Sequence, residues 1–392
     1  MALRHWLQLA LTDGIGPILT TRLIAAAGSA EAAAGADRKL LQSVEGIGPG
    51  KATAIYDSLR SAAETAPKEI DRCAAAGITL ICRDDAEYPP LLKAIPDPPP
   101  VLYVQGTLEP RDLNALAVVG SRTCSHYGRE QAERFGALLA GAGMTVISGG
   151  ARGVDSAAHR GALSHPHGRT IAVLGCGVDV VYPPENENLF GQIVERGAII
   201  SEFPMGTPPV RENFPRRNRI VSGMSRGVLV IEADLKSGAL ITARQACDDH
   251  GRPVFAVPGR VDNAMSGGPH ALIRDGAVLT AGLPDILENL GPLPEGAVTA
   301  PIDEISEAAS KEEGALFDAE PVAAPVAMTA SKISTLTDRQ RHVLDGMGND
   351  PTDVEGIIGR TDLAAEVVLG ELTLLSLRGL VRRVDGTTYQ RR

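Results

Sequence analysis

Aromatic residues are scarce in this sequence: they make up 3% of 392 residues, with one tryptophan, six tyrosines and six phenylalanines. A function that stacks rings on a ligand must therefore use very few side chains. Long apolar runs are also missing, since none approaches the roughly 20 residues that a membrane-spanning helix needs. The first residues, with an early Asp13 and Gly14, do not have the pattern of a signal peptide.

Cysteines are few and far apart. They form no C-x-x-C pair, which argues against a zinc ribbon and against a disulfide framework. A chain with this cysteine usage is expected in the reducing cytosol. The five cysteines are Cys73, Cys82, Cys124, Cys176 and Cys247.

Acidic charge is concentrated in one segment. Residues 291–330 hold eight acids and one base, a net charge of −7, which leaves −3 for the rest of a chain whose total is −10. The segment is rich in Pro and Ala and has no sustained period, so we expect an acidic linker there.

Basic charge is concentrated between Arg211 and Arg226, where five arginines, one acid and one phenylalanine share sixteen residues. Pro215 favours a helix start, and a helix from there to Met224 would carry its arginines on a limited surface. Arginine forks suit phosphate oxygens, and the ring of Phe214 could stack a base. The alternative is a solvated basic helix start.

Residues 1–66 contain an internal repeat. Gly14-Ile-Gly16 and Gly46-Ile-Gly48 are 32 residues apart, and each is followed by a helical run. The pattern predicts paired helix-hairpin-helix units, in which glycines let a hairpin backbone approach a phosphate. A purely structural helical domain is the alternative, because few bases flank the first hairpin. The run Gly46–Lys51 lacks P-loop spacing.

Residues 67–110 read as a connector, with a helix near Pro67–Ala76 and strands at Ile78–Cys82 and Val101–Val104. From 111 to 290, continuous apolar runs alternate with helical stretches, which predicts a doubly wound, Rossmann-like parallel sheet. The expected strands are Leu116–Val119, Met144–Ile147, Ile171–Leu174, Ala198–Ile200, Val228–Ile231 and Val254–Val257, and the expected helices are Tyr127–Ala140, Val154–Ala162, Asn186–Arg196, Pro215–Met224 and Leu240–His250.

Glycine-rich and polar segments follow these strands, where such folds bind ligands, and several of them carry a basic residue. They predict an anion-binding pocket. A dinucleotide cofactor is not expected, because Gly175–Val180 lacks the last glycine of G-x-G-x-x-G and follows the third strand. No metal site or catalytic centre is expected either: Asp155 and His159 read as a capping acid and a surface histidine, with no third ligand nearby.

Residues 331–392 return to helical periodicity. A helix starting near Leu336-Thr337, helical material at Asp362–Glu366 and Val367–Arg378, and a strand-turn-strand from Val381 to Tyr389 predict a winged helix-turn-helix. Nine bases and nine acids cancel, so duplex binding has weak support. A role in contacting protein stays open.

Several motifs in one order now become recognisable: Tyr88–Leu92, Val119–Arg122, Ser148–Asp155, Asn213–Ser222 and Lys236–Ala243. Together they resemble the DprA (Smf) family of DNA-processing proteins of bacterial natural transformation, over almost the whole chain. The resemblance implies a homodimer that binds single-stranded DNA, protects it, loads RecA onto it and displaces single-strand-binding protein.

The family's DNA pocket carries over to Arg122, Arg211, Phe214 and Lys236, with Arg211 standing where lysine is common. Six further residues of the matching motifs are expected in the same site: Ser121, Arg152, Gly153, Arg217, Asn218 and Ser237. The leading hypothesis is a binding protein and not an enzyme. The alternative is a nucleotide-processing enzyme similar to phosphoribohydrolases, but the Thr and Glu of their glycine-rich segment are missing after Gly149-Gly150. A pure adaptor with an unused pocket is the third possibility.

Overall fold

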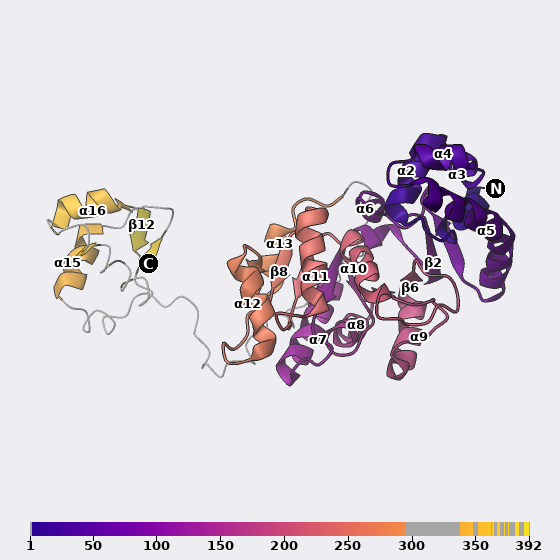
Figure 1. Ribbon diagram of the computed structural model, residues 1–392. Coiled ribbons are helices and arrows are strands. Elements are labelled where there is room, and N and C mark those ends of the chain that lie inside the picture. Colours follow the sequence, from indigo (N-terminus) through magenta and orange to yellow (C-terminus); the bar gives the residue numbers. More distant parts are fainter. Residues whose placement is uncertain are drawn as a thin grey trace. The chain divides into compact units, whose positions relative to one another are not determined.

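A computed structural model describes residues 2–294, 338–347, 352–361, 381–383 and 388–391, with the single positions 363, 367, 368, 372 and 375. The chain divides into two compact units, Met1–Ser310 and Lys311–Arg392, which are treated separately below (Figure 1). Apart from residues 291–294, the expected acidic linker lies outside the described residues. No helix in the described ranges combines the length and the apolar character that crossing a membrane requires.

The described part of the first unit is built on one nine-stranded sheet with the order β1-β2-β6-β5-β4-β3-β7-β8-β9. Strands β3 to β9 run parallel, and β2 and β1 continue the sheet antiparallel beside β6. The strands are β1 (Thr79–Cys82), β2 (Val101–Gly106), β3 (Ala115–Val119), β4 (Thr145–Ser148), β5 (Thr170–Val173), β6 (Ala198–Ser201), β7 (Val228–Val230), β8 (Val254–Ala256) and β9 (Val278–Leu279).

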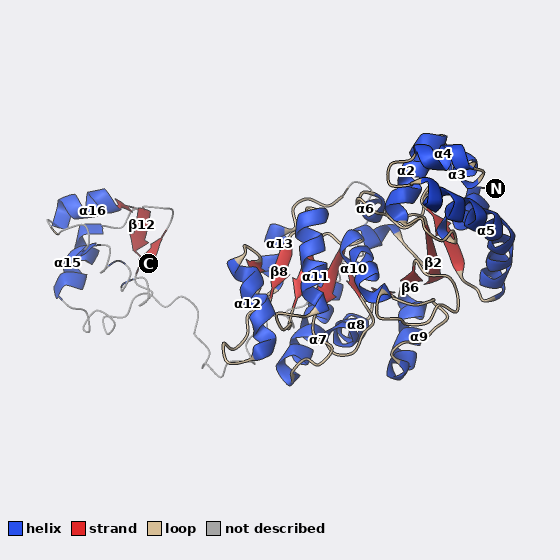
Figure 2. Cartoon of the chain, viewed as in Figure 1, coloured by secondary structure: helices blue, strands red, loops and turns tan. Residues whose placement is uncertain are grey.

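Helices cover both faces of this sheet, which is why its central strands are apolar at every position (Figure 2). In β3, Leu116 and Val118 belong to the core that includes Phe135 of α7, while Ala117 belongs to the core that includes Ile220 of α10. The helices are α7 (His126–Gly141), α8 (Val154–Ser164), α9 (Glu187–Arg196), α10 (Asn213–Gly223), α11 (Gly238–Arg244), α12 (Gly267–Arg274) and α13 (Leu283–Asn289). The predicted doubly wound fold is therefore confirmed.

The N-terminal region is helical, and both Gly-Ile-Gly segments are turns between helices. The first turn separates α1 from α2 and the second separates α4 from α5. Gly14 and Gly46 have φ angles of +84° and +93°, which glycine adopts without strain. The helices are α1 (Ala2–Ala10), α2 (Pro17–Ala27), α3 (Ala30–Ala34), α4 (Arg38–Ser43) and α5 (Pro49–Ala75).

Helix α5 has 27 residues and contains Pro67 in its interior. The predicted boundary at residue 66 thus falls inside one continuous helix, and the separate helix expected near Pro67 does not exist. Proline has no N–H to donate to the carbonyl four residues earlier. That oxygen, on Ala63, receives a long hydrogen bond of 3.4 Å from Arg4 Nη2 instead. The N-terminal helices also share a hydrophobic core with β1, β2 and β5, so this region is packed onto the sheet.

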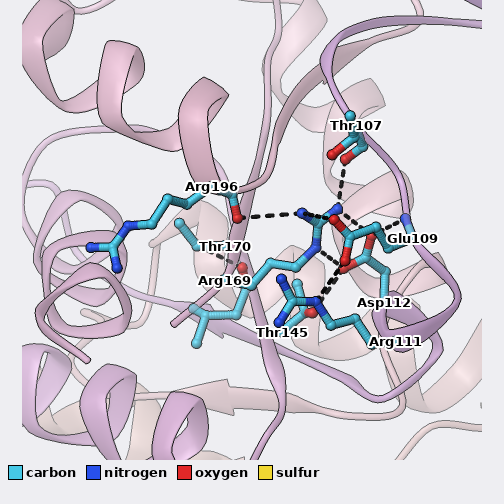
Figure 3. A network of polar contacts seen from close by, with 9 residues as sticks. Thr107, Glu109, Arg111, Asp112, Thr145, Arg169, Thr170 and Arg196 are labelled. Atoms are coloured by element: carbon cyan, nitrogen blue, oxygen red, sulfur yellow. Dashed lines mark hydrogen bonds and ion pairs between the residues drawn. The ribbon is translucent and has the colours of Figure 1, made fainter. Parts of the chain in front are cut away.

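At the amino ends of the parallel strands, a buried arginine ties the connector to the sheet (Figure 3). Arg169 Nε donates to Asp112 Oδ1 at 2.6 Å and Nη2 donates to Asp112 Oδ2 at 2.8 Å. Thr145 Oγ1, on β4, donates to the same carboxylate at 2.8 Å, and Arg169 also reaches Thr107 O. This charged network lies at the opposite end of the strands from their carboxyl termini.

The second unit contains α15 (Asp338–Met347), α16 (Val354–Thr361) and a three-stranded sheet in the order β10-β12-β11. Its strands are β10 (Thr352–Asp353), β11 (Val381–Arg383) and β12 (Thr388–Arg391). The winged-helix prediction is confirmed, but α16 was not foreseen. Of the helical material expected from 362 to 378, Val367, Val368, Leu372 and Leu375 are helical, Leu363 is not, and the remaining positions lie outside the described residues.

Candidate nucleic-acid interface

The first unit has a cavity of about 600 Å³ at the carboxyl ends of its parallel strands. The turns after β3, β4 and β7 border it, because parallel strands bring their carboxyl ends to one edge of a sheet. The amino-terminal part of α10 contributes the facing wall. Its lining includes three cations, Arg122, Arg211 and Arg217, and two anions, Asp155 and Asp234.

Most of the predicted site residues meet in this cavity. Its lining contains Ser121, Arg122, Arg211, Phe214, Arg217, Asn218 and Ser237. Arg122 and Arg211 are exposed, and neither has a hydrogen-bond or ion-pair partner among the described residues. Both guanidinium groups are therefore available to an anion.

Three predicted residues do not line the cavity. The guanidinium of Arg152 pairs with both carboxylate oxygens of Glu185, with Nη2 and Oε2 3.0 Å apart, and this pairing lowers the pKa of Glu185. Lys236 is exposed beside the cavity, and its backbone N–H donates to Asp234 Oδ1 at 2.6 Å. Gly153 packs against the backbone of Ser121 and Arg122, which do line the cavity.

Gly153 has a structural reason to be glycine. Its φ is +75°, and an added Cβ would lie 2.3 Å from Ser121 O and 2.8 Å from the carbonyl carbon of Arg122. The first residue of α8, Val154, donates its N–H to Ser121 O at 3.2 Å. The close approach of these two backbones sets the turn that carries Arg122.

Phe214 is already in contact with other side chains. The Arg122 guanidinium lies over its ring, 4.8 Å from the centroid. The ring of Tyr182 lies 5.7 Å away, tilted by 42°. Beneath them, an added Cβ on Gly175 would be 2.9 Å from Phe214 Cδ1, so the glycine makes room for the ring. Arg122, Phe214 and Tyr182 thus form a stacked group at the rim, which we call the rim stack.

Arg217 is buried in the cavity floor. One of its terminal nitrogens donates to Val173 O, and its Nε has no partner among the described residues. Burial lowers the pKa of Arg217 to about 10, and the neighbouring Asp155 carboxylate opposes the shift. Burial also raises the pKa of Asp155, again against the effect of Arg217. The missing side chain of Gly149 leaves space for this pair.

The basic stretch does not form one charged surface, which corrects the expectation from sequence. Arg219 is buried in ion pairs with Glu202 at 2.8 Å and Asp97 at 2.9 Å. Arg226 is buried against Asn114 Oδ1, 2.6 Å from its Nη1. With Arg217 in the cavity floor, only Arg211 and Arg216 remain exposed. Helix α10 also begins at Asn213, two residues before Pro215.

The model of the family described as DNA recombination-mediator protein A matches residues 79–291, more than half of this chain. Protein Smf of Synechocystis sp. is 34% identical over 99% of this chain and 98% of its own length. This chain belongs to the DprA/Smf family. The DprA winged helix domain matches residues 327–387.

Other DprA/Smf proteins match smaller parts. Protein Smf of Escherichia coli is 49% identical over 54% of this chain and 56% of its own length. The X-ray structure of DNA processing protein A from Streptococcus pneumoniae is similar with a TM-score of 0.64 and 31% identity, covering 74% of this chain and 100% of that one. These likenesses agree with the sheet and helices described above.

Sequence reasoning about this DprA/Smf chain missed Tyr182 and misjudged His159. Tyr182 follows the Gly175–Val180 segment, which was considered only as a failed coenzyme motif; a tyrosine shortly after a strand end in an aromatic-poor chain was the available signal. The expected surface histidine is wrong, because His159 is fully buried and its Nδ1 is 2.7 Å from Thr170 Oγ1. Burial, with the charges of Arg217 and Arg160, lowers the pKa of His159 to about 3.

Asp155 does not cap α8: it is the second residue of this helix, and it accepts a hydrogen bond at 3.3 Å from Ala151 N, two residues before the N-cap Gly153. Nowhere in the described ranges do three His, Cys, Asp or Glu side chains gather as metal ligands would. The cavity offers hydrogen-bond donors and positive charge from its arginines, and the rim stack adds flat surfaces. This arrangement suits an anionic ligand that carries a flat group.

Proposed function

We propose that this chain binds single-stranded DNA in the cavity at the carboxyl ends of β3, β4 and β7. One observation carries the proposal. The guanidinium groups of Arg122 and Arg211, which have no ion-pair partner among the described residues, line the same cavity as the ring of Phe214, and Arg122 lies over this ring. Arg122 and Arg211 would contact phosphates, with Lys236 beside the cavity as a third contact. Membership of the DprA/Smf family supports the same assignment.

The rim stack modifies the expected stacking of a base directly on Phe214. Because the Arg122 guanidinium occupies a face of this ring, an incoming base meets the guanidinium plane first. Guanidinium planes stack bases as aromatic rings do. Phe214 and Tyr182 would then hold Arg122 flat. Since every base has a π face, this mode of binding tolerates different sequences.

The remaining predicted residues have supporting roles in this proposal. Ser121 and Gly153 shape the turn that carries Arg122, and Arg217 adds positive charge from the cavity floor. Asn218 and Ser237 would position the start of α11, since Asn218 Nδ2 lies 3.4 Å from Gly238 O and Ser237 Oγ accepts from Ala239 N at 3.3 Å. Arg152 would need to release Glu185 before contacting DNA.

The proposed role is binding and not catalysis. We infer that the chain protects incoming DNA and loads RecA onto it in natural transformation, as a cytoplasmic homodimer that displaces single-strand-binding protein, and that residues 111–290 carry the DNA contact. These parts of the proposal rest on the family alone. Base release from a nucleoside monophosphate at high protein concentration would instead support the phosphoribohydrolase-like alternative.

The test is a titration of oligothymidylate at two salt concentrations with the full chain. Arg122→Ala should weaken binding and reduce the salt slope by roughly 0.7, the value of one phosphate on a single strand. Arg216→Ala is the matched control, because Arg216 is exposed on the same basic stretch, lies over Phe203 and does not line the cavity. The Arg216→Ala variant loses the same charge as Arg122→Ala but should change the salt slope of binding little.

The combined Arg122→Ala, Phe214→Ala variant removes the rim stack. If the ring supports a stacked base, losing it should cost about 1 to 3 kcal/mol of binding free energy. Oligonucleotide affinity equal to that of the unsubstituted chain would refute the proposed site.

A further inference from the structure

One loop leads from β6 to α10 and carries Arg211 to the cavity. This loop, residues 202–212, is held in its middle by the C-terminal part of α5. Arg72 Nη1 donates to Met205 O at 3.0 Å, and Met205 N donates to Glu69 Oε1 at 2.8 Å. Both polar groups of the Met205 backbone are therefore bound by side chains of one helix.

The same arginine also holds the loop that follows β5. Arg72 Nη2 lies 3.3 Å from Asp179 Oδ2, and the other oxygen of Asp179 accepts from Gly206 N at 2.7 Å. The two loops are joined again where Gly177 N donates to Thr207 O at 3.0 Å. Gly206 has a φ of +77°, and an added Cβ there would lie 3.1 Å from Arg72.

Each of these two loops supplies residues to the cavity lining. The loop after β5 carries Tyr182 three residues beyond Asp179, and the loop after β6 carries Arg211 six residues beyond Met205. Arg72 itself does not line the cavity. We propose that Arg72 is a positioning residue: by fixing both loops to α5, it lets the helical N-terminal region set the affinity of the cavity for its anionic ligand. This inference rests on the proposed function.

Arg72 can be removed without removing the fold. Its guanidinium is half exposed to water, which weakens its ion pairs with Asp179 at 3.3 Å and Glu69 at 3.9 Å, and Glu69 keeps the hydrogen bond from Met205 N when Arg72 is removed. The loop has its own core contacts through the buried side chains of Phe203 and Met205. What Arg72 adds is a restraint on local opening, which is a low-energy motion in loops. Its loss should therefore appear in the loop and at the rim before it appears in unfolding.

The experiment compares the full chain with Arg72→Ala in two measurements. Hydrogen exchange is followed in peptides covering residues 202–212, and oligothymidylate affinity is titrated at two salt concentrations. We expect faster exchange in this loop and affinity weakened by about two- to thirtyfold, the usual range for residues that act through others. The salt slope should not change, because no phosphate contact is lost.

Two further variants sharpen the result. Arg60→Ala removes an exposed arginine of the same helix that contacts Tyr56 and not the loops, and should leave exchange and affinity unchanged. Arg72→Lys keeps the charge and one donor group, and should recover part of the affinity.

Each outcome decides the inference. Unchanged exchange in residues 202–212, or unchanged affinity despite faster exchange, overturns it. A salt slope reduced by roughly 0.7 also overturns it, because Arg72 would then be a phosphate ligand itself. If the unsubstituted chain binds no oligonucleotide, the proposed function fails and the affinity part of this inference fails with it, whereas the exchange result still decides whether Arg72 restrains the loops.

Discussion

At the scale of single residues, arginines of one short segment have separate tasks. Arg211 is exposed at the cavity, Arg217 lies in its floor, and Arg219 joins the connector to α10 through Asp97. Charge counted along the sequence cannot separate these roles, because burial and the partner acid decide them. Only the fold brings Glu202 and Asp97 to one guanidinium.

Gly153 offers a test of backbone approach at the cavity. Gly153→Ala should destabilise the first unit by roughly 2 to 4 kcal/mol, because a Cβ meets Ser121 O at 2.3 Å and the positive φ disfavours alanine. Urea unfolding can be followed by the fluorescence of Trp6, the single tryptophan, which is buried in the first unit.

Gly191→Ala is the matched control for that substitution. Gly191 lies inside α9 and has no atom within 4 Å of an added Cβ. Alanine there should be neutral or stabilising by about 0.5 to 1 kcal/mol. Equal unfolding midpoints for the two variants would contradict the close approach at Gly153.

His159 predicts a pH dependence of stability. Its pKa in the fold is about 3, below the ordinary 6.5, so the unfolded chain binds a proton that the folded chain does not between these values. The free energy of unfolding should therefore fall as the pH drops below 6.5, by about 1.4 kcal/mol per pH unit from this group. The stability is present above pH 6.5 and is lost towards pH 3.

The measurement compares the unsubstituted chain with His159→Asn, which can still hydrogen-bond Thr170 but does not titrate. Urea unfolding followed by Trp6 fluorescence at several pH values gives the slope of each. The variant should have the shallower acid limb. Parallel curves would mean that the pKa of His159 is the same in the folded and the unfolded chain.

At the scale of elements, α5 is the clearest departure from what local sequence implies. Pro67 reads as a helix start, yet the helix continues through it. Packing against β1 and the shared N-terminal core outweighs the lost hydrogen bond. The preference of a single proline for a helix start is therefore weak evidence for a helix boundary when buried residues continue at helical spacing on both sides of it.

Pro67→Ala should stabilise the first unit. Alanine restores a donor for Ala63 O and removes the ring clash, for a gain of about 1 to 3 kcal/mol. Urea unfolding followed by Trp6 fluorescence measures it, with Ala63→Gly, which weakens the same helix, as a variant of opposite sign. A less stable Pro67→Ala chain would show that the bend at proline is needed for packing.

Much of the sheet could be predicted because its strands are continuous apolar runs, and all six expected parallel strands, β3 to β8, are present. The edge strand β9 has two residues, Val278 and Leu279, neither of them buried, so it gives no apolar run to detect. The place of the cavity could be predicted from the glycine-rich and basic segments that follow the strands. The acidic partners of the arginines in the basic stretch could not, because Asp155 beside Arg217 and Asp97 beside Arg219 come from distant parts of the chain.

At the scale of the whole chain, an acidic protein has a cavity lined by three arginines and two aspartates, with the guanidinium groups of Arg122 and Arg211 exposed. The excess of acid lies in residues 291–330, which follow α13 in the sequence and contribute no residue to the cavity lining. Because exposed charges are screened over about 10 Å in ordinary salt, overall net charge is a poor guide to what the cavity binds.

Removing residues 295–392 tests where DNA contact lies. If the cavity carries the binding, the shortened chain should keep the salt slope of the full chain to within about 0.7, one single-strand phosphate contact. Titration of oligothymidylate at two salt concentrations measures this, and Arg122→Ala in the shortened chain is the control. A slope that drops by several contacts would instead place the main DNA surface beyond residue 294.

The different partners of these arginines also constrain which substitutions related sequences can accept. Arg219 satisfies two carboxylates at once, so neutral replacements at 219, 202 and 97 should occur together in related genes and rarely alone. Arg211 has no acidic partner among the described residues and should exchange freely with lysine. Substitutions at 219, 202 and 97 should therefore be correlated with one another, whereas those at 211 should be independent of them.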